Sequence, residues 1–217
     1  MLKHTKTISY IYIALLFLCG LMIQDVTGQV NNLVVLPSRK IQSQDTDIYF
    51  PEGVFSSDPG TSERKAEIYS RRLKLMSETP IFAANNPPTE VYRFLWGRSF
   101  HSPIMIRVQK SGNNYSLVLK KAKKQDSDII IEKEEERTIT SKEWNTFINH
   151  LNKLSFWNYS SFNDKVCLDG ATWMLEGSRN KKYHMVHRHC PKSQKLRNAC
   201  LYLVKLSGLK LDPQEIY

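Results

Sequence analysis

The sequence predicts an α+β fold: an antiparallel sheet of about five strands with two or three helices packed mainly on one face. Two observations lead to the sheet. Apolar and polar residues alternate between residues 91 and 139 and again between 168 and 190, and short turn sequences separate the alternating segments. A third observation gives the helices, since other segments carry apolar residues at helical spacing. Helices packed on a sheet built from hairpins are typical of the α+β class.

The first predicted helix begins at Asp58-Pro59 and ends near Ser77. Asp58 is a good capping residue, and Pro59 is compatible with the first helical turn because its missing amide hydrogen is not needed there. The apolar residues of this segment fall on one stripe and its basic residues on the remainder. The stripe consists of Ile68, Tyr69, Leu73 and Met76.

The strand predictions follow from a change of period to two after residue 90. Ser111-Gly112-Asn113-Asn114 is a turn signal between two alternating segments, and a second turn is expected at residues 125–128. A later hairpin is expected to turn at Arg179-Asn180-Lys181. The predicted strands cover residues 91–96, 103–108, 115–120, 129–139, 168–178 and 182–190.

Two helices are predicted after the strands. Thr140-Ser141-Lys142-Glu143 is a capping box, in which the threonine hydroxyl accepts from the amide of Glu143 and the carboxylate reaches back. A last helix begins near Ser193 and stops at Gly208. The residues expected to face the sheet are Trp144, Phe147, Ile148, Leu151 and Leu154 in the first of these helices, and Leu196, Ala199, Cys200, Leu203 and Leu206 in the second.

The first 28 residues have the three parts of a secretory signal peptide. Lys3 and Lys6 precede an apolar stretch over residues 8–23, and Val26 and Gly28 suit the −3 and −1 positions, so cleavage is expected after Gly28. The stretch has 16 residues, whereas a membrane-spanning helix needs about 20. We therefore expect an exported chain, periplasmic or extracellular, with no transmembrane span after signal removal. An uncleaved membrane anchor is the alternative.

The rest of the chain is expected to hold a single domain. Residues 29–60 contain several prolines and glycines and no sustained period, which indicates an irregular lead-in. Residues 61–217 contain no internal repeat and no linker long enough to divide them. We therefore assign residues 61–217 to one α+β domain.

A surplus of positive charge limits the choice of partners. The formal net charge is +10, and removal of residues 1–28 leaves 29 basic against 20 acidic side chains, or +9. Such a surplus favours anionic partners, but the basic residues are scattered and no nucleic-acid-binding module accompanies them. The partner is unknown, with an anionic surface or another exported protein as candidates.

Several short segments form a recognisable pattern: IYSRRL (68–73), YRFLW (92–96), SFHSPI (99–104), EW (143–144), FW (156–157), DGATWMLEG (169–177) and YHMV (183–186). From about residue 65 onward, the chain resembles a family of uncharacterised bacterial exported proteins with no assigned activity. The resemblance implies one domain and export, and it supplies no mechanism. The family pattern has an acidic residue in place of His187 and a tryptophan near His189 or Cys190, so chemistry built on these residues would be peculiar to this chain.

A possible catalytic cluster consists of Glu176, His184 and Arg188. If residues 179–181 form a three-residue loop, Glu176 pairs with His184 on the face that also carries Arg188. A carboxylate, an imidazole and a guanidinium together could support acid–base chemistry on a phosphoester. The competing interpretation is a cross-strand charge network. A shift of the register by one residue would separate the carboxylate from the imidazole.

His187 and His189 are weak candidates for a metal site. On a strand they point to the same side, a spacing that can hold zinc or copper. A stable site needs a third ligand, and Cys190 points to the other side of a regular strand. The competing interpretation is two partly exposed histidines near a strand end. The sequence therefore predicts no metal and no cofactor.

Three cysteines follow the predicted signal peptide. Cys167 and Cys190 flank the second hairpin and form the more favourable disulfide pair in an oxidising compartment. Cys200 lies on the apolar face of the last helix and is expected in the core.

These observations favour an exported basic binding or accessory protein that is not an enzyme and whose ligand is unknown. The alternative is a small secreted hydrolase that acts on phosphoesters through Glu176, His184 and Arg188. A third interpretation is a basic protein that its charge holds at a membrane or cell wall.

Overall fold

The computed structural model describes residues 48–84, 88, 90–125, 128–163 and 167–217. These residues lie in one compact unit that comprises residues 46–217. The predicted signal peptide, the cleavage site after Gly28 and the lead-in up to residue 47 lie outside the described residues. Among the described helices, none has both the length and the apolar character needed to cross a membrane.

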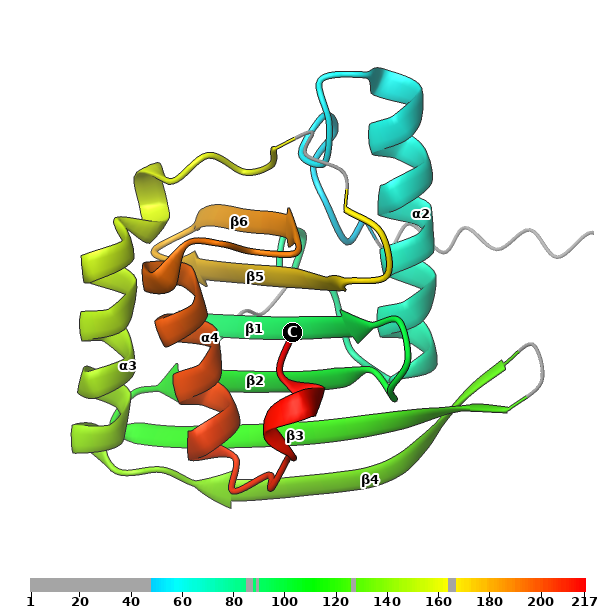
Figure 1. Ribbon diagram of the computed structural model, residues 1–217. Coiled ribbons are helices and arrows are strands. Elements are labelled where there is room, and N and C mark those ends of the chain that lie inside the picture. Colours follow the sequence, from blue (N-terminus) through cyan, green and yellow to red (C-terminus); the bar gives the residue numbers. More distant parts are fainter. Residues whose placement is uncertain (1–47, 85–87, 89, 126–127, 164–166) are drawn as a thin grey trace, which may run out of the picture. The chain divides into compact units, whose positions relative to one another are not determined.

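The α+β prediction is confirmed, and the sheet has six strands where about five were expected. The strand order is β4-β3-β2-β1-β5-β6, and every neighbouring pair is antiparallel (Figure 1). Hairpins therefore connect β1 to β2, β2 to β3 and β3 to β4. The chain then returns, and β5 pairs with β1. The strands are β1 (Glu90–Arg98), β2 (Ile104–Ser111), β3 (Asn114–Gln125), β4 (Asp128–Thr138), β5 (Ala171–Arg179) and β6 (Lys182–His189).

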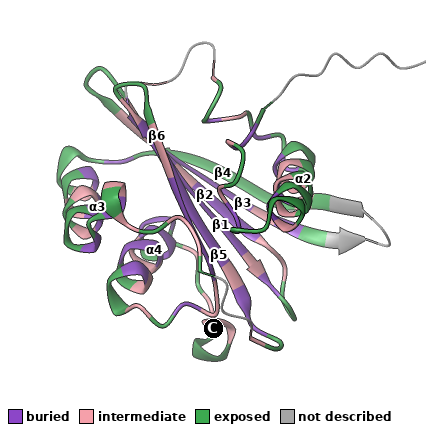
Figure 2. Ribbon diagram, turned by 90° about the horizontal axis from the view of Figure 1, so that it is seen from above, coloured by how far each residue is buried: buried purple, intermediate pink, exposed green. Residues whose placement is uncertain are grey.

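In the described part of the chain, three α-helices cover the two faces of the sheet. Figure 2 shows α3 (Ser141–Leu154) and α4 (Gln194–Leu206) on one side and α2 (Pro59–Leu75) on the other. Two short 3₁₀ helices, η1 (Phe156–Asn158) and η2 (Pro213–Glu215), complete the described helical segments. Because both faces are covered, central strands such as β1 are buried almost throughout.

The predicted capping residues begin the helices as expected. The Asp58 side chain accepts from the amide of Thr61, and Pro59 occupies the first turn of α2. Both hydrogen bonds of the capping box between Thr140 and Glu143 are present at the start of α3. These side chains satisfy amide groups that the first helical turn leaves without a partner.

The end of α2 directs a carboxylate toward the sheet. Ser77 follows the helix with a φ of +53°, and its amide donates to the Lys74 carbonyl. The amide of the next residue, Glu78, donates to the Leu73 carbonyl at 3.0 Å. This pair of bonds is the Schellman motif, with serine at the left-handed position that glycine usually takes. The reversal places Glu78 between α2 and the strands.

Each face of the sheet has its own hydrophobic core. The core under α3 and α4 is aromatic and includes Tyr92, Phe94, Trp96 and Trp173 from the strands. Tyr92 lies against Gly177 of β5, where a Cβ atom would overlap its ring. The core under α2 is smaller, and several of its strand positions carry charged side chains instead of apolar ones.

Candidate functional site

The predicted register of the second hairpin is wrong by one residue. Its turn has two residues, Asn180 and Lys181, both with positive φ, and Arg179 pairs with Lys182. Glu176 therefore lies opposite Met185, and His184 lies opposite Gly177. Because neighbouring residues of a strand point to opposite faces, the sheet separates Glu176 from His184.

His184 and Arg188 lie on the face that α3 and α4 cover. The His184 ring packs edge-on against Phe156 of η1, with 5.1 Å between ring centroids. Arg188 donates to the carbonyl of Ser160 at 2.7 Å and lies over the Tyr159 ring. Both side chains thus attach the segment after α3 to the sheet, and neither contacts Glu176, the carboxylate of the predicted cluster.

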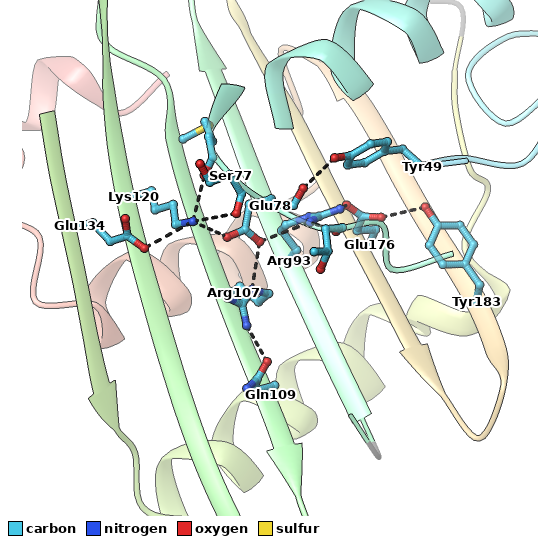
Figure 3. Close-up of polar contacts among 12 residues, drawn as sticks. Tyr49, Ser77, Glu78, Arg93, Arg107, Gln109, Lys120, Glu134, Glu176 and Tyr183 are labelled. Atoms are coloured by element: carbon cyan, nitrogen blue, oxygen red, sulfur yellow. Dashed lines mark hydrogen bonds and ion pairs between the residues drawn. The ribbon is translucent and has the colours of Figure 1, made fainter. Parts of the chain in front are cut away.

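Glu176 belongs to a row of polar side chains that crosses all six strands beneath α2 (Figure 3). Arg93 binds one of its oxygens through Nε at 2.8 Å and Nη2 at 2.7 Å. The Tyr183 hydroxyl donates to its other oxygen at 2.9 Å. From one edge of the sheet to the other, the row is Glu134, Lys120, Arg107, Arg93, Glu176 and Tyr183.

Glu78 joins the middle of this row from above. One carboxylate oxygen lies 2.9 Å from Lys120 Nζ, and the other lies 2.9 Å from Arg107 Nε and 3.3 Å from Arg93 Nη1. Arg93 and Arg107 are direct cross-strand neighbours, an arrangement that is unfavourable without an intervening anion. Lys120 also donates to the carbonyls of Met76 and Ser77. The cluster therefore fixes the end of α2 to the sheet.

Burial and the neighbouring cations act in opposite directions on the pKa values of Glu78 and Glu176. Burial opposes the ionised form of Glu78, but the three surrounding cations outweigh it and hold the pKa of the carboxyl below its usual range. Burial raises the pKa of Glu176, and Arg93 and Tyr183 oppose this change. The Arg93 and Glu176 side chains are fully buried, so no substrate can reach them. We interpret the row as a structural network.

His187 and His189 share the face that α2 covers, as their spacing predicts. His187 is buried, which contradicts the interpretation of two partly exposed histidines. Its Nε2 is hydrogen-bonded to the Tyr69 hydroxyl at 3.1 Å, and the Phe55 ring packs edge-on against it. Burial lowers the pKa of His187 to about 3, and nearby cations add to this effect. His187 is therefore a neutral core residue at physiological pH.

The predicted disulfide between Cys167 and Cys190 is confirmed, with a Cα–Cα distance of 6.4 Å. Cys200 is a free thiol buried in the core, as expected. The two disulfide sulfurs and a ring nitrogen of His189 lie within 4.8 Å of one another, a spacing that could hold a metal ion. However, His189 Nε2 donates to the Cys167 carbonyl at 2.9 Å, and Nδ1 accepts from Thr172 at 3.2 Å. In the oxidised protein none of these atoms is available to a metal.

Gly170 makes the disulfide possible, and its replacement by alanine should disrupt it. A Cβ at this position would lie 2.6 Å from Cys167 Sγ and would overlap Cys190 Sγ. We expect Gly170→Ala to lower the free energy of unfolding by about 2–4 kcal/mol, as loss of such a disulfide does. Thiol titration under denaturing conditions and urea unfolding measure both effects. Gly60→Ala, whose Cβ would meet Asp58 Oδ2 at an ordinary contact distance of 3.8 Å, is the control, and full disulfide content with unchanged stability in Gly170→Ala would contradict the argument.

A cleft of about 680 Å³ lies at the end of the sheet where β1 ends and β5 begins. Its walls come from α2, the end of β1 with the loop that follows it, Lys123 of β3, the start of β5 and the end of β6. The α2 residues are Ile68, Tyr69 and Arg72. Its lining includes Arg72, Arg98, Lys123, His101 and His189 but no aspartate or glutamate among the described residues. We refer to it as the anion cleft.

Arg72 and Lys123 are the cations of the anion cleft that have no ion-pair partner among the described residues, although Arg72 lies over the Tyr69 ring, 5.8 Å from its centroid. Arg98 donates to the Ser102 carbonyl and pairs with Glu215 at 2.8 Å, so its charge is compensated. The guanidinium of Arg72 has no hydrogen-bond or ion-pair partner among the described residues. It lies against Gly97, where a Cβ would come within 2.7 Å of Nη1. A glycine thus allows this guanidinium to approach β1 closely.

The loop between β1 and β2 is held in place by several hydrogen bonds. The hydroxyl of Tyr217 accepts from the amide of Phe100 at 3.0 Å and is bonded to Nδ1 of His101 at 3.1 Å. Ser99 donates to the Gly170 carbonyl at 2.6 Å, which joins this loop to the segment before β5. The wall of the anion cleft is therefore formed before any ligand binds.

Comparisons with protein-family models and with curated proteins find no match. The resemblance to a family of exported proteins therefore stays a hypothesis.

The anion cleft was missed at the sequence level. Arg72 lies in a helix rich in basic residues, and Lys123 lies in a lysine-rich strand, so neither stands out. His101 lies beside Ser99 and Ser102 in the SFHSPI segment, but no oriented catalytic triad can be inferred from that spacing. A loop with exposed Phe100 and His101 between two buried strands is nevertheless a sign of function.

Proposed function

We propose that this chain is an exported binding protein that takes the anionic group of a ligand into the anion cleft. The observation that carries the proposal is the positive charge of Arg72 and Lys123, which have no ion-pair partner among the described residues, in a cleft with no carboxylate in the described part of its lining. A volume of about 680 Å³ lies within the ordinary range of small-molecule sites. The basic character of the whole chain adds a long-range attraction for anions.

The chemistry of the lining favours a phosphate or carboxylate group. A guanidinium presents paired N–H donors that match two oxygens of such a group. Lys123, in the same lining, adds a point charge on a flexible side chain. These groups can hold an anion without any change in its covalent bonds, so the proposal is binding and not catalysis.

The hydrolase alternative has lost its main support. It required Glu176, His184 and Arg188 on one face, and the register places the carboxylate on the other face. Within the anion cleft, both ring nitrogens of His189 are already hydrogen-bonded. A general base needs a free lone pair within reach of the substrate, which His189 does not offer.

Titration with glycerol 3-phosphate, followed by two-dimensional NMR of the labelled chain, tests the proposal. We expect shifts confined to amides around the anion cleft. Arg72→Gln should weaken binding about tenfold or more, because a charged hydrogen-bond pair contributes about 1.5–3 kcal/mol. Gly97→Ala keeps every charge but displaces the guanidinium, so it should weaken binding several-fold.

Lys110→Gln is the matched control, because Lys110 lies at the opposite end of β2 and packs over the Tyr115 ring. It should leave the affinity for glycerol 3-phosphate unchanged. Equal losses in Lys110→Gln and Arg72→Gln would mean that only general charge attracts the ligand, and the proposal would then be wrong.

Export is part of the proposal and rests on the N-terminal 28 residues alone. Sequencing the amino terminus of the chain recovered from outside the cytoplasm checks it. We expect the chain to begin at Gln29, and an intact Met1 would instead support the uncleaved anchor.

A further inference from the structure

Exposed apolar side chains gather at the end of the sheet that holds the anion cleft. Among the described residues, seven large apolar side chains are exposed, and four of them lie at this end. Phe100 and Ile68 line the cleft, and Ile130 is the cross-strand partner of the lining residue Lys123. Leu168 lies two positions before the lining residue Gly170. Single exposed apolar residues are common, but a group around one cleft indicates an interaction surface.

The two most exposed members of this group are on loops that a disulfide and hydrogen bonds attach to the fold. Leu168 is 90% exposed and Phe100 is 70% exposed. Leu168 follows Cys167 of the disulfide, and the amide of Phe100 donates to Tyr217. The hydrogen bond from Ser99 to Gly170 joins the two loops. Both side chains are thus held toward solvent, and a partner that covers them gains apolar burial with little ordering cost.

The charge of this end complements an anionic surface. Arg72 and Lys123 line the cleft and have no ion-pair partner among the described residues. In the described part of the loop that carries Leu168, the one acidic residue is Asp169. Glu215 is already paired with Arg98. Protruding apolar side chains around uncompensated cations are the combination by which peripheral proteins bind lipid, since the cations attract headgroups and the apolar groups enter the acyl boundary.

We propose that this end of the molecule binds the surface of an anionic lipid bilayer, with a headgroup phosphate in the anion cleft and with Phe100 and Leu168 inserted at the interface. The inference rests on the proposed function, because the same cleft receives the phosphate. It adds a source for that phosphate and a role for the apolar loops. A flat protein partner would leave the cleft unfilled, whereas a headgroup projects from its membrane and can enter it.

Co-sedimentation of the whole chain with vesicles tests this inference. One set of vesicles is pure phosphatidylcholine, and the other contains phosphatidylcholine and phosphatidylglycerol in a ratio of about 7:3. The N-terminal segment carries Lys3 and Lys6 and can itself favour anionic vesicles, but its contribution is the same in every variant, so the comparison between variants isolates the loops and the cleft. We expect additional binding to the anionic vesicles that falls at least tenfold at high salt, because exposed charges are then screened.

Two pairs of variants distinguish docking through this end of the molecule from nonspecific adsorption of exposed apolar or basic residues elsewhere on the surface. Replacement of both Phe100 and Leu168 by serine should reduce this additional binding at least tenfold, because interfacial burial of each apolar side chain is lost. Phe82→Ser is the control: Phe82 is also exposed but packs against Tyr183, at the opposite end of β6. Arg72→Gln should reduce vesicle binding about fivefold, and Lys110→Gln should not.

Each outcome decides the inference. Loss of binding in the loop variant with retention in Phe82→Ser supports it. Equal binding to both vesicle compositions, or an equal loss in Phe82→Ser, overturns it. If glycerol 3-phosphate binds the cleft while anionic vesicles gain nothing over neutral ones, the lipid inference fails and the proposed function stands. If the phosphate ester also fails to bind, both are wrong.

Discussion

Replacement of Glu78 by glutamine is expected to lower the free energy of unfolding by about 3–5 kcal/mol, the cost of removing one partner from a buried ion pair. The carboxylate contacts Lys120, Arg107 and Arg93 within 3.3 Å. Without it, the cross-strand neighbours Arg93 and Arg107 face each other with less compensation in a region of low dielectric. Glutamine keeps the size of the side chain, so the loss reports charge and not a cavity.

Glu134→Gln is the matched control for this prediction. Glu134 pairs with the same Lys120 at 3.4 Å, but its side chain is 52% exposed. An exposed ion pair contributes about 0–1 kcal/mol, so the control should change stability very little. Urea unfolding followed by tryptophan fluorescence measures both variants. Similar losses in the two variants would show that Glu78 does not anchor the network.

The strands and helices were predictable because their signals are local. The capping box at Thr140 involves residues three positions apart, and the helix after it has its apolar face at regular spacing. Alternation of polar and apolar residues locates the strands in the same way. The disulfide was also within reach, because Cys167 and Cys190 flank one hairpin.

The register of the second hairpin was not predictable from the same signals. A two-residue turn of this kind requires positive φ at both positions, for which Asn-Gly is the usual sequence. Here the second position is Lys181, with a φ of +62°. Lysine rarely adopts this conformation, so a three-residue loop was a reasonable expectation. The error of one residue moved Glu176 to the other face and removed the predicted catalytic cluster.

The buried network and the anion cleft depend on contacts between distant residues. Glu78 meets Arg107 across 29 positions, and Arg93 meets Glu176 across 83 positions. In the sequence, Arg93 and Arg107 are the hints, since each interrupts an otherwise apolar strand. An isolated arginine of this kind indicates a buried partner without naming it.

Acidification from pH 7 to pH 5 is expected to lower the free energy of unfolding by about 2 kcal/mol through His187 alone. Burial lowers the pKa of its imidazole from 6.5 in the unfolded chain to about 3 in the folded chain. Between these values the unfolded state binds one more proton than the folded state, so stability is present above pH 6.5 and falls as the pH falls toward 3. Burial also lowers the pKa of His184, which adds to the loss.

His187→Gln separates this effect from the titration of carboxylates. Glutamine is neutral throughout and can still bond the Tyr69 hydroxyl, which lies 3.1 Å from Nε2 of His187. We expect the variant to lose most of the pH dependence between pH 7 and pH 5, even if its stability at pH 7 is lower. Below about pH 4 the dependence should return, because the lowered pKa of Glu78 makes its ion pairs acid-labile. A variant whose stability falls as steeply as that of the original chain between pH 7 and pH 5 would show that His187 is not held neutral in the core.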